Sequence, residues 1–251
     1  MDFSFDILLI TAFIFFFAAL IHGSIGTGFP MIATPLLALF TDIQTAIILT
    51  LIPNIVINIV SIVTEGNPLS ALRRHLPLAL FALLGSIIGT QILISSNSEL
   101  FKVLLAIAIL SYILAEKIRL NLSWIRKYPK SSRAGFGTSA GILGGLTNVM
   151  APILFIYSLE SRHSKSDIIQ ASNLCFLFGK IVQIILFTNS EKITVNHFSI
   201  SSAMLVVTAI ALFFGVKIKR KIKVEAYKKL LRGLLIILAI TILLQVLLKS
   251  A

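Results

Sequence analysis

Lys180 is the residue of this sequence that is hardest to explain by packing alone. It lies near the middle of an apolar stretch that runs from Leu174 to Phe187. A lysine at the centre of a membrane helix costs about 2.5–3.5 kcal/mol on insertion scales, so it needs a partner or a water-filled cavity. Because no acid lies within the corresponding spans, we expect Lys180 to attract an anionic solute. Snorkelling towards the nearer interface, or pairing with a buried acid, is the alternative.

Neutral polar residues interrupt the same kind of apolar stretch at four other positions. Asn54 and Asn58 are four residues apart and therefore share one helical face, and Asn173 and Gln183 fall on or beside the stripe of Lys180. We predict that these four amides contact the solute. The alternative is hydrogen bonding between helices, which is worth about 0.6 kcal/mol on average.

Two segments rich in glycine and proline, 22–35 and 141–152, interrupt apolar blocks that would otherwise form long helices. Glycine and proline remove helix propensity and amide donors, and unwound backbone at membrane depth is tolerated only where it packs on protein or lines a wet cavity. The free amides and helix dipoles of such breaks suit an anion. The residues predicted to bind the solute there are Gly23, Ser24, Gly26, Thr27, Gly28, Thr34, Gly141, Gly144, Gly145, Thr147 and Asn148. Close helix packing by the glycines, and hydroxyl bonds back to their own helix, are the alternatives.

The four histidines show no spacing typical of a metal site or of a nucleophile with its base. His75, His163 and His197 are scattered, whereas His22 directly precedes the first break. With an unperturbed pKa of about 6.5, His22 is a candidate for proton coupling, although a helix cap is the alternative. We predict no cofactor, no metal and no catalytic residue, so an intramembrane enzyme is only an alternative from another functional class.

The composition places the whole chain in a membrane. Hydrophobic residues make up 57% of the 251 and charged residues 13%, against roughly 45–50% and about 25% in soluble domains. The net charge of +12 comes mainly from two short connections, 117–133 and 217–232, as the positive-inside rule predicts. The expected partners are therefore membrane lipids and a small anionic solute, with no nucleic acid, and the oligomeric state is left open.

The order of apolar segments indicates an internal repeat. We predict a first membrane repeat at 1–115, a basic cytoplasmic linker at 116–133 and a second membrane repeat at 134–251. Each repeat has a broken block followed by three spans, at 7–40, 43–63, 76–94 and 100–115, and again at 134–159, 168–188, 198–216 and 230–248. Matching positions at offsets between 117 and 126 are Gly23 and Gly141, Gly26 and Gly144, Pro35 and Pro152, and Gly89 and Gly215.

Charge predicts the orientation of the two repeats. If each broken block crossed the membrane once, the two basic connections would lie on opposite sides, whereas both favour the cytoplasm. If each block returns to its own side, both connections become cytoplasmic and the two repeats have inverted topology. The predicted fold is therefore an all-α polytopic membrane protein of two inverted repeats, each a broken or re-entrant segment plus three transmembrane helices. A hairpin and two short full crossings satisfy this parity equally well.

The spacing Gly23-x-x-Gly26-x-Gly28 with Pro35 downstream, its echo at 141–152, the basic linker and the total length resemble the sulfite exporter TauE/SafE family of membrane permeases. The segment Leu146-Thr147-Asn148 departs from the family pattern, which often has more glycine there. The resemblance implies a multi-pass carrier of the inner membrane for sulfite, sulfonates, sulfoacetate or another small anion. Alternating access by a secondary transporter is the predicted mechanism, and a passive anion channel is the alternative.

Overall fold

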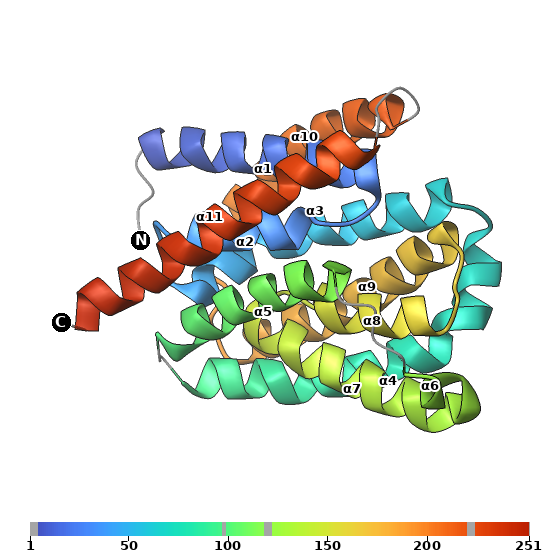
Figure 1. Ribbon diagram of the computed structural model, residues 1–251. Helices are drawn as coiled ribbons and strands as arrows, with labels where there is room; N and C mark the ends of the chain where they lie inside the picture. The colour runs from blue at the N-terminus through green and yellow to red at the C-terminus, as the bar shows by residue number, and fades with distance from the viewer. Residues whose placement is uncertain (1–4, 97–98, 118–121, 220–223, 251) are drawn as a thin grey trace.

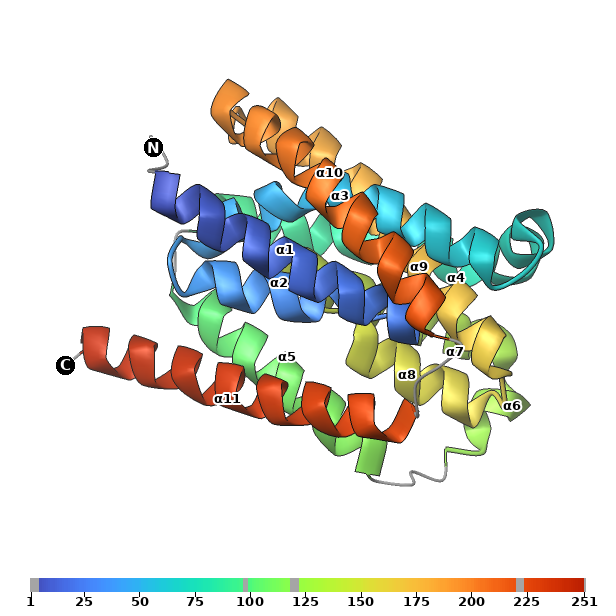
Figure 2. The same cartoon turned by 90° about the horizontal axis from the view of Figure 1, so that it is seen from above.

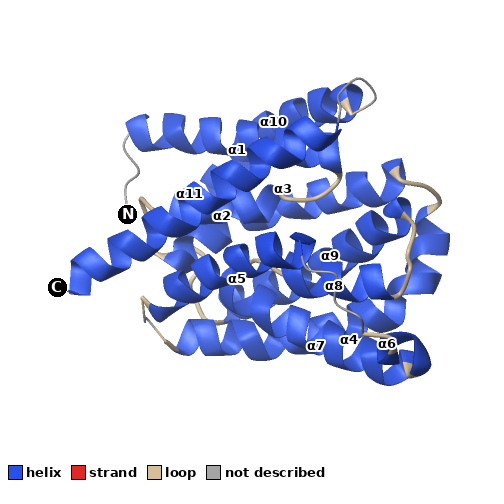
Figure 3. Cartoon of the chain, in the orientation of Figure 1, coloured by secondary structure: helices blue, strands red, loops and turns tan. Residues whose placement is uncertain are grey.

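The computed structural model describes residues 5–96, 99–117, 122–219 and 224–250, which form helices and no strand (Figure 1, Figure 3). The helices are α1 (Phe5–Ile25), α2 (Phe29–Ala38), α3 (Ile43–Thr64), α4 (Pro68–Ser95), α5 (Leu100–Lys117), α6 (Trp124–Lys127), α7 (Pro129–Thr147), α8 (Ala151–Glu160), α9 (Lys165–Asn189), α10 (Val195–Ile218) and α11 (Val224–Ser250). The prediction of an all-helical fold is confirmed.

Five of these helices, α1, α3, α4, α9 and α10, are long and apolar enough to cross a membrane. The spans predicted at 43–63, 76–94, 168–188 and 198–216 fall within the last four. Helix α4 begins eight residues before its predicted span, because Asn67 caps it through the amides of Leu69 and Ser70. The apolar parts found in α5 and α11, 100–114 and 232–248, are shorter.

The first broken block consists of a full-length helix and a half-length helix. Helix α1 ends at Ile25, and φ angles of +95° at Gly26 and +114° at Gly28 lie in the left-handed region that favours glycine. Helix α2 then turns back along α1 (Figure 1, Figure 2). The block therefore returns towards the side on which α1 begins.

The second broken block has the same form, in α7 and α8. Helix α7 ends at Thr147, Asn148 has φ of +67°, and α8 begins at Ala151. The amide of Leu122, which precedes α7, donates to Glu160 at the end of α8, so this block also returns to its own side. Helix α7 itself begins at Pro129, inside the segment predicted as a linker.

The correspondence expected between Pro35 and Pro152 is wrong. Pro30 is the second residue of α2 and Pro152 the second residue of α8, whereas Pro35 lies inside α2. Proline is favoured in the first turn of a helix because backbone amides there have no acceptor within the helix, so the lack of an amide hydrogen costs nothing. The two half-length helices thus begin 122 residues apart, at Phe29 and Ala151, and Gly26 matches Asn148 instead of Gly144.

Polar contacts define two ends of the molecule. At one end, which we call the basic end, Arg74 pairs with Asp167 and Lys219 contacts Glu65. The basic residues of this end are Arg73, Arg74, Arg126, Lys127, Lys130, Arg133, Arg162, Lys165, Lys217 and Lys219. Arg220, Lys221 and Lys223, from the same basic connection, lie outside the described residues. At the far end, Gln44 donates to the carbonyl of Ser96.

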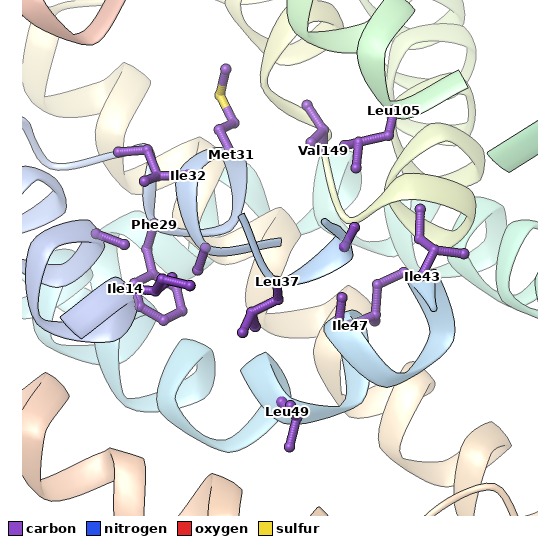
Figure 4. Close-up of a cluster of buried hydrophobic side chains, with 14 of the residues drawn as sticks. Ile14, Phe29, Met31, Ile32, Leu37, Ile43, Ile47, Leu49, Leu105 and Val149 are labelled. Carbon is purple, nitrogen blue, oxygen red and sulfur yellow. The ribbon is translucent and has the colours of Figure 1, made fainter. Parts of the chain in front are cut away.

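Helix α2 lies inside the protein and not against lipid. Nine of its ten residues are buried, and the ring of Phe29 meets Phe15 of α1 edge to face at 5.5 Å between centroids. Figure 4 shows Phe29, Ile32 and Leu37 in one cluster with Ile14 of α1 and Ile47 of α3. The first break is therefore enclosed by protein, which is the condition under which unwound backbone is stable in a membrane.

Glycine faces bring two pairs of helices into close contact. A Cβ atom on Gly23 of α1 would lie 3.0 Å from the Cα of Gly215 in α10, and one on Gly145 of α7 would lie 2.9 Å from the Cα of Gly89 in α4. Close approach of this kind is how membrane helices gain packing contacts without a hydrophobic driving force.

We expect Gly141→Ala to destabilise the protein and Gly135→Ala in the same helix to leave it unchanged or slightly more stable. A Cβ on Gly141 would overlap the carbonyl oxygen of Ala82 and lie 2.8 Å from the amide of Ser86, whereas one on Gly135 meets nothing within 4 Å. The first change should cost about 1–3 kcal/mol. Thermal unfolding of the purified variants in detergent measures both, and equal melting temperatures would contradict the packing role of Gly141.

Candidate functional site

Lys180 lies in the middle of a fully buried polar network. Its side chain is 0% exposed, and Nζ contacts Oδ1 of Asn148 and Oε1 of Gln183. Both partners are neutral amide oxygens that accept from the lysine. The acids in the ion pairs of the described residues, Asp167, Glu99 and Glu65, lie at the two ends of the molecule. No ion pair of Lys180 occurs among the described residues, so within this part of the chain the positive charge has local dipoles around it and no counter-ion.

Asn148 joins this lysine to two other helices, α2 and α3. Its amide nitrogen donates to Oγ1 of Thr34 in α2 at 2.7 Å and to Oγ1 of Thr50 in α3 at 2.9 Å. We call Lys180, Asn148, Gln183, Thr34 and Thr50 the Lys180 network. The network brings together five residues from both halves of the chain, and four of them were predicted site residues.

Thr50 is the member that the sequence analysis missed. It lies four residues before Asn54, which itself lies four before Asn58, so the helical spacing that picked out the two asparagines also covers Thr50. Ser61 continues the same face three residues after Asn58. Threonine is common in apolar helices, so the four-residue spacing from Asn54 is the signal in the sequence that marks Thr50 as a site residue.

A second polar group surrounds the first break. Nδ1 of His22 accepts from the backbone amide of Phe29 at 3.1 Å, and Nε2 lies 2.9 Å from Oγ of Ser61. Asn173 donates to the carbonyl of Gly26 at 2.9 Å, and to Ile169 in its own helix. Three predicted residues, His22, Gly26 and Asn173, thus come together here.

The polar face of α3 connects the two groups. We call Thr50, Asn54, Asn58 and Ser61 the α3 stripe. Thr50 contacts Asn148 at the second break, and Ser61 contacts His22 at the first. Between them, Asn54 is 0% and Asn58 1% exposed, and neither side-chain amide has a hydrogen-bond partner among the described residues. Buried side-chain amides are rarely left without hydrogen bonds, so the free donors and acceptors of the stripe indicate a polar ligand or water.

A cavity of about 370 Å³ reaches both breaks. Thr27 and Gly28 line it from the first break and Ala151 from the start of α8, while Lys165 lines it at the basic end. The N-termini of the two half-length helices thus border one cavity, where their unpaired amides and dipoles favour negative charge. The Lys180 network lies outside this lining.

The remaining predicted residues lie in contacts within or between helices. Gly23, Gly141 and Gly145 pack against neighbouring helices, and a Cβ on Gly144 would meet the side chain of Met150. The hydroxyl of Ser24 donates to Leu20 and that of Thr147 to Leu143, four residues earlier in each case. These are the alternatives that glycine and hydroxyl residues offer in any membrane helix.

Fold and site together define a polytopic α-helical membrane protein whose buried polar groups gather at two helix breaks, as in membrane transporters. The family model named Sulfite exporter TauE/SafE matches residues 11–242, and the chain belongs to this family of membrane transporters. The resemblance noted in the sequence is thereby confirmed. Members of the family are transporters and not enzymes. A search of curated proteins and a search of solved structures found no match to the chain.

We expect Asn148→Ala to be more destabilising than Asn148→Gly. Both variants lose the contacts to Lys180, Thr34 and Thr50, but only alanine must also hold a left-handed φ of +67°, which costs about 1–2 kcal/mol more. Thermal unfolding in detergent compares the two. Equal stability would show that the backbone at the second break relaxes without its left-handed residue.

Proposed function

We propose that this protein is a permease that moves a small oxyanion, such as sulfite or a sulfonate, across the inner membrane by alternating access. The observation that carries the proposal is the buried Lys180. Among the described residues it has only neutral partners, and it stands beside the α3 stripe, where the side-chain amides of Asn54 and Asn58 are unpaired. A buried cation without a counter-ion, next to unused donors, suits an anion that arrives, binds and leaves.

The anion would bind between the two breaks, along the α3 stripe. Asn54 and Asn58 would donate their amide hydrogens to it, and Lys180 would exchange an amide oxygen of Asn148 or Gln183 for an oxygen of the anion. Exchanging one of these acceptors costs little free energy, because the lysine loses a hydrogen bond to an amide oxygen and gains one to the anion. The site thus stays bonded when the anion leaves.

Helix packing supports two inverted repeats. Helix α1 packs on α10 as α7 packs on α4, α3 packs on α10 as α9 packs on α4, and α2 packs on α11 as α8 packs on α5. In each of these three comparisons, replacing α1–α5 by α7–α11 in order, and the reverse, turns the first pair of helices into the second. The Gly23–Gly215 and Gly145–Gly89 contacts repeat the same exchange at single residues.

Two separate cavities support a carrier. The cavity at the breaks includes Lys165 of the basic end, whereas a second cavity of about 420 Å³ at the far end is lined by Gln44, Lys102 and Lys192. The two linings share no residue, and the Lys180 network belongs to neither. An anion held between them would be passed from one cavity to the other when the helices shift, which is alternating access.

We expect Lys180→Met to lower sulfite exchange by about 10- to 100-fold, because hydrogen bonds to charged groups are worth about 1.5–3 kcal/mol and each 1.4 kcal/mol is tenfold. Lys130→Met, at an exposed lysine of the basic end, is the matched control and should exchange normally. Exchange of labelled sulfite in proteoliposomes measures both. Wild-type rates in Lys180→Met would remove the lysine from the site, and single-channel current steps in the wild type would replace the carrier by a channel.

The basic end should face the cytoplasm, because positively charged connections stay on that side. The chain has a single cysteine, Cys175, which is buried, so Cys175→Ala provides a background for labelling. In that background, an impermeant maleimide should label Glu191→Cys in intact cells and Lys130→Cys only after the membrane is opened. The reverse pattern would overturn the orientation.

A further inference from the structure

The hydrogen bonds of His22 fix where its ring carries a proton. A backbone amide can only donate, so Nδ1, which accepts from Phe29, has no hydrogen. The hydrogen of the neutral ring is therefore on Nε2, where Oγ of Ser61 accepts it at 2.9 Å. In this state both ring nitrogens are bonded and the ring is uncharged.

A second proton on His22 is incompatible with this arrangement. In the imidazolium both nitrogens are donors, so Nδ1 can no longer accept from Phe29. Phe29 is the first residue of α2, and its amide would lose its partner in the same event that places a positive charge beside it. A free amide at a helix N-terminus next to a cation is a strong site for an anion.

We propose that His22 is the coupling site for protons, and that its protonation releases the Phe29 amide to bind the transported anion. This inference rests on the proposed function and adds the coupling ion to it. The proton and the anion bind together, because protonation leaves the Phe29 amide and Nδ1 of His22 as donors without an acceptor. The anion supplies an acceptor to both and offsets the positive charge of the ring. The two then cross the membrane in the same direction, so the pH gradient drives the anion.

The cavity at the breaks ends next to the Phe29 amide, although neither Phe29 nor His22 belongs to its lining. Gly28 and Pro30, on either side of Phe29, both line the cavity. Asn58 lies on α3 one turn before Ser61, is 1% exposed and has no hydrogen-bond partner among the described residues. The released amide and the unpaired amide of Asn58 thus supply independent donors around the same end of the α3 stripe.

The charged groups that act on His22 come from the basic end. Lys219 at the end of α10 acts on it electrostatically and contacts Glu65 at the end of α3. Partial burial lowers the pKa of Lys219. Helix α2 contributes the Phe29 amide and α9 the neutral Asn173. The ion pair of Lys219 with Glu65 limits the repulsion that an imidazolium would meet, since the acid lies on the same side.

The two breaks would then divide the work. Counted by the 122-residue offset of the breaks, His22 corresponds to Gly144, Asn58 to Lys180 and Ser61 to Gln183. The contact of His22 with Ser61 thus matches the contact of Gln183 with the carbonyl of Gly144 at 3.4 Å. The second break thus has a lysine where the first has Asn58, and the first has a titratable ring where the second has Gly144.

The experiment compares sulfite exchange at several pH values in proteoliposomes containing the full chain, with labelled sulfite as the probe. The wild-type rate should rise as the pH falls. In His22→Asn, whose Oδ1 can still accept from Phe29 but cannot be protonated, the rate should be lower and should lose most of this rise. His163→Asn, outside both breaks, should keep the wild-type profile. Sulfite itself takes up protons, and comparison of variants in identical buffers cancels this contribution.

A wild-type pH profile in His22→Asn would overturn the proton site while leaving the permease intact, whereas no exchange in the wild type would overturn the permease itself. Histidine labelled with ¹⁵N provides a readout that does not depend on transport, since the chain has only four histidines. The His22 signals should change from the neutral Nε2–H form to imidazolium when sulfite is added at mildly acidic pH. If the His22 ring stays neutral with sulfite bound, the proposal is wrong, and this result does not depend on whether His22→Asn folds.

Discussion

The structure depends on one constraint: inside a membrane, every amide and every charge must find its partner within the protein. Lys180 shows the constraint most clearly, because the charge sits at 0% exposure with two neutral oxygens beside it. Those oxygens come from Gln183 of the same helix and from Asn148, the residue at which α7 ends. The residue at the break in the helix therefore supplies one of the hydrogen bonds that the buried charge needs.

Much of this arrangement follows from residue types alone. The breaks were predicted because glycine and proline disfavour helices, and Lys180, Asn54 and Asn58 because polar side chains in apolar helices must be explained. The register of the second break could not be predicted, since a left-handed asparagine at 148 takes the place that glycine holds at 26. Without coordinates, Pro35 is as good a match for Pro152 as Pro30 is. Likewise, Gly23 and Gly26 have the same composition signal, and only the contacts separate a packing glycine from one that turns the chain.

The two breaks use different chemistry for a similar geometry. At the second, an asparagine side chain spreads hydrogen bonds over α2, α3 and α9. At the first, glycines leave the backbone bare, and the side chains of His22 and Asn173 come from outside to bond the exposed amide and carbonyl. In the proposed transport cycle, Lys180 at the second break attracts anions at all times, whereas the first break attracts them only when His22 is protonated. If the two halves are repeats, as proposed above, such a difference would let one break respond to a proton that the other ignores.

The glycine contacts also govern how the chain is made. Helix α1 packs on α10 and α4 on α7, so the earliest helices meet their partners only after much later segments have been synthesised. Gly23 and Gly89 therefore lack the helices that they pack against in the folded protein until α10 and α7 have been synthesised. The interior is complete only when α10 has packed on α1 and α3, and α11 on α2 and α5. The buried contacts of the first helices thus require most of the chain to be present before they can form.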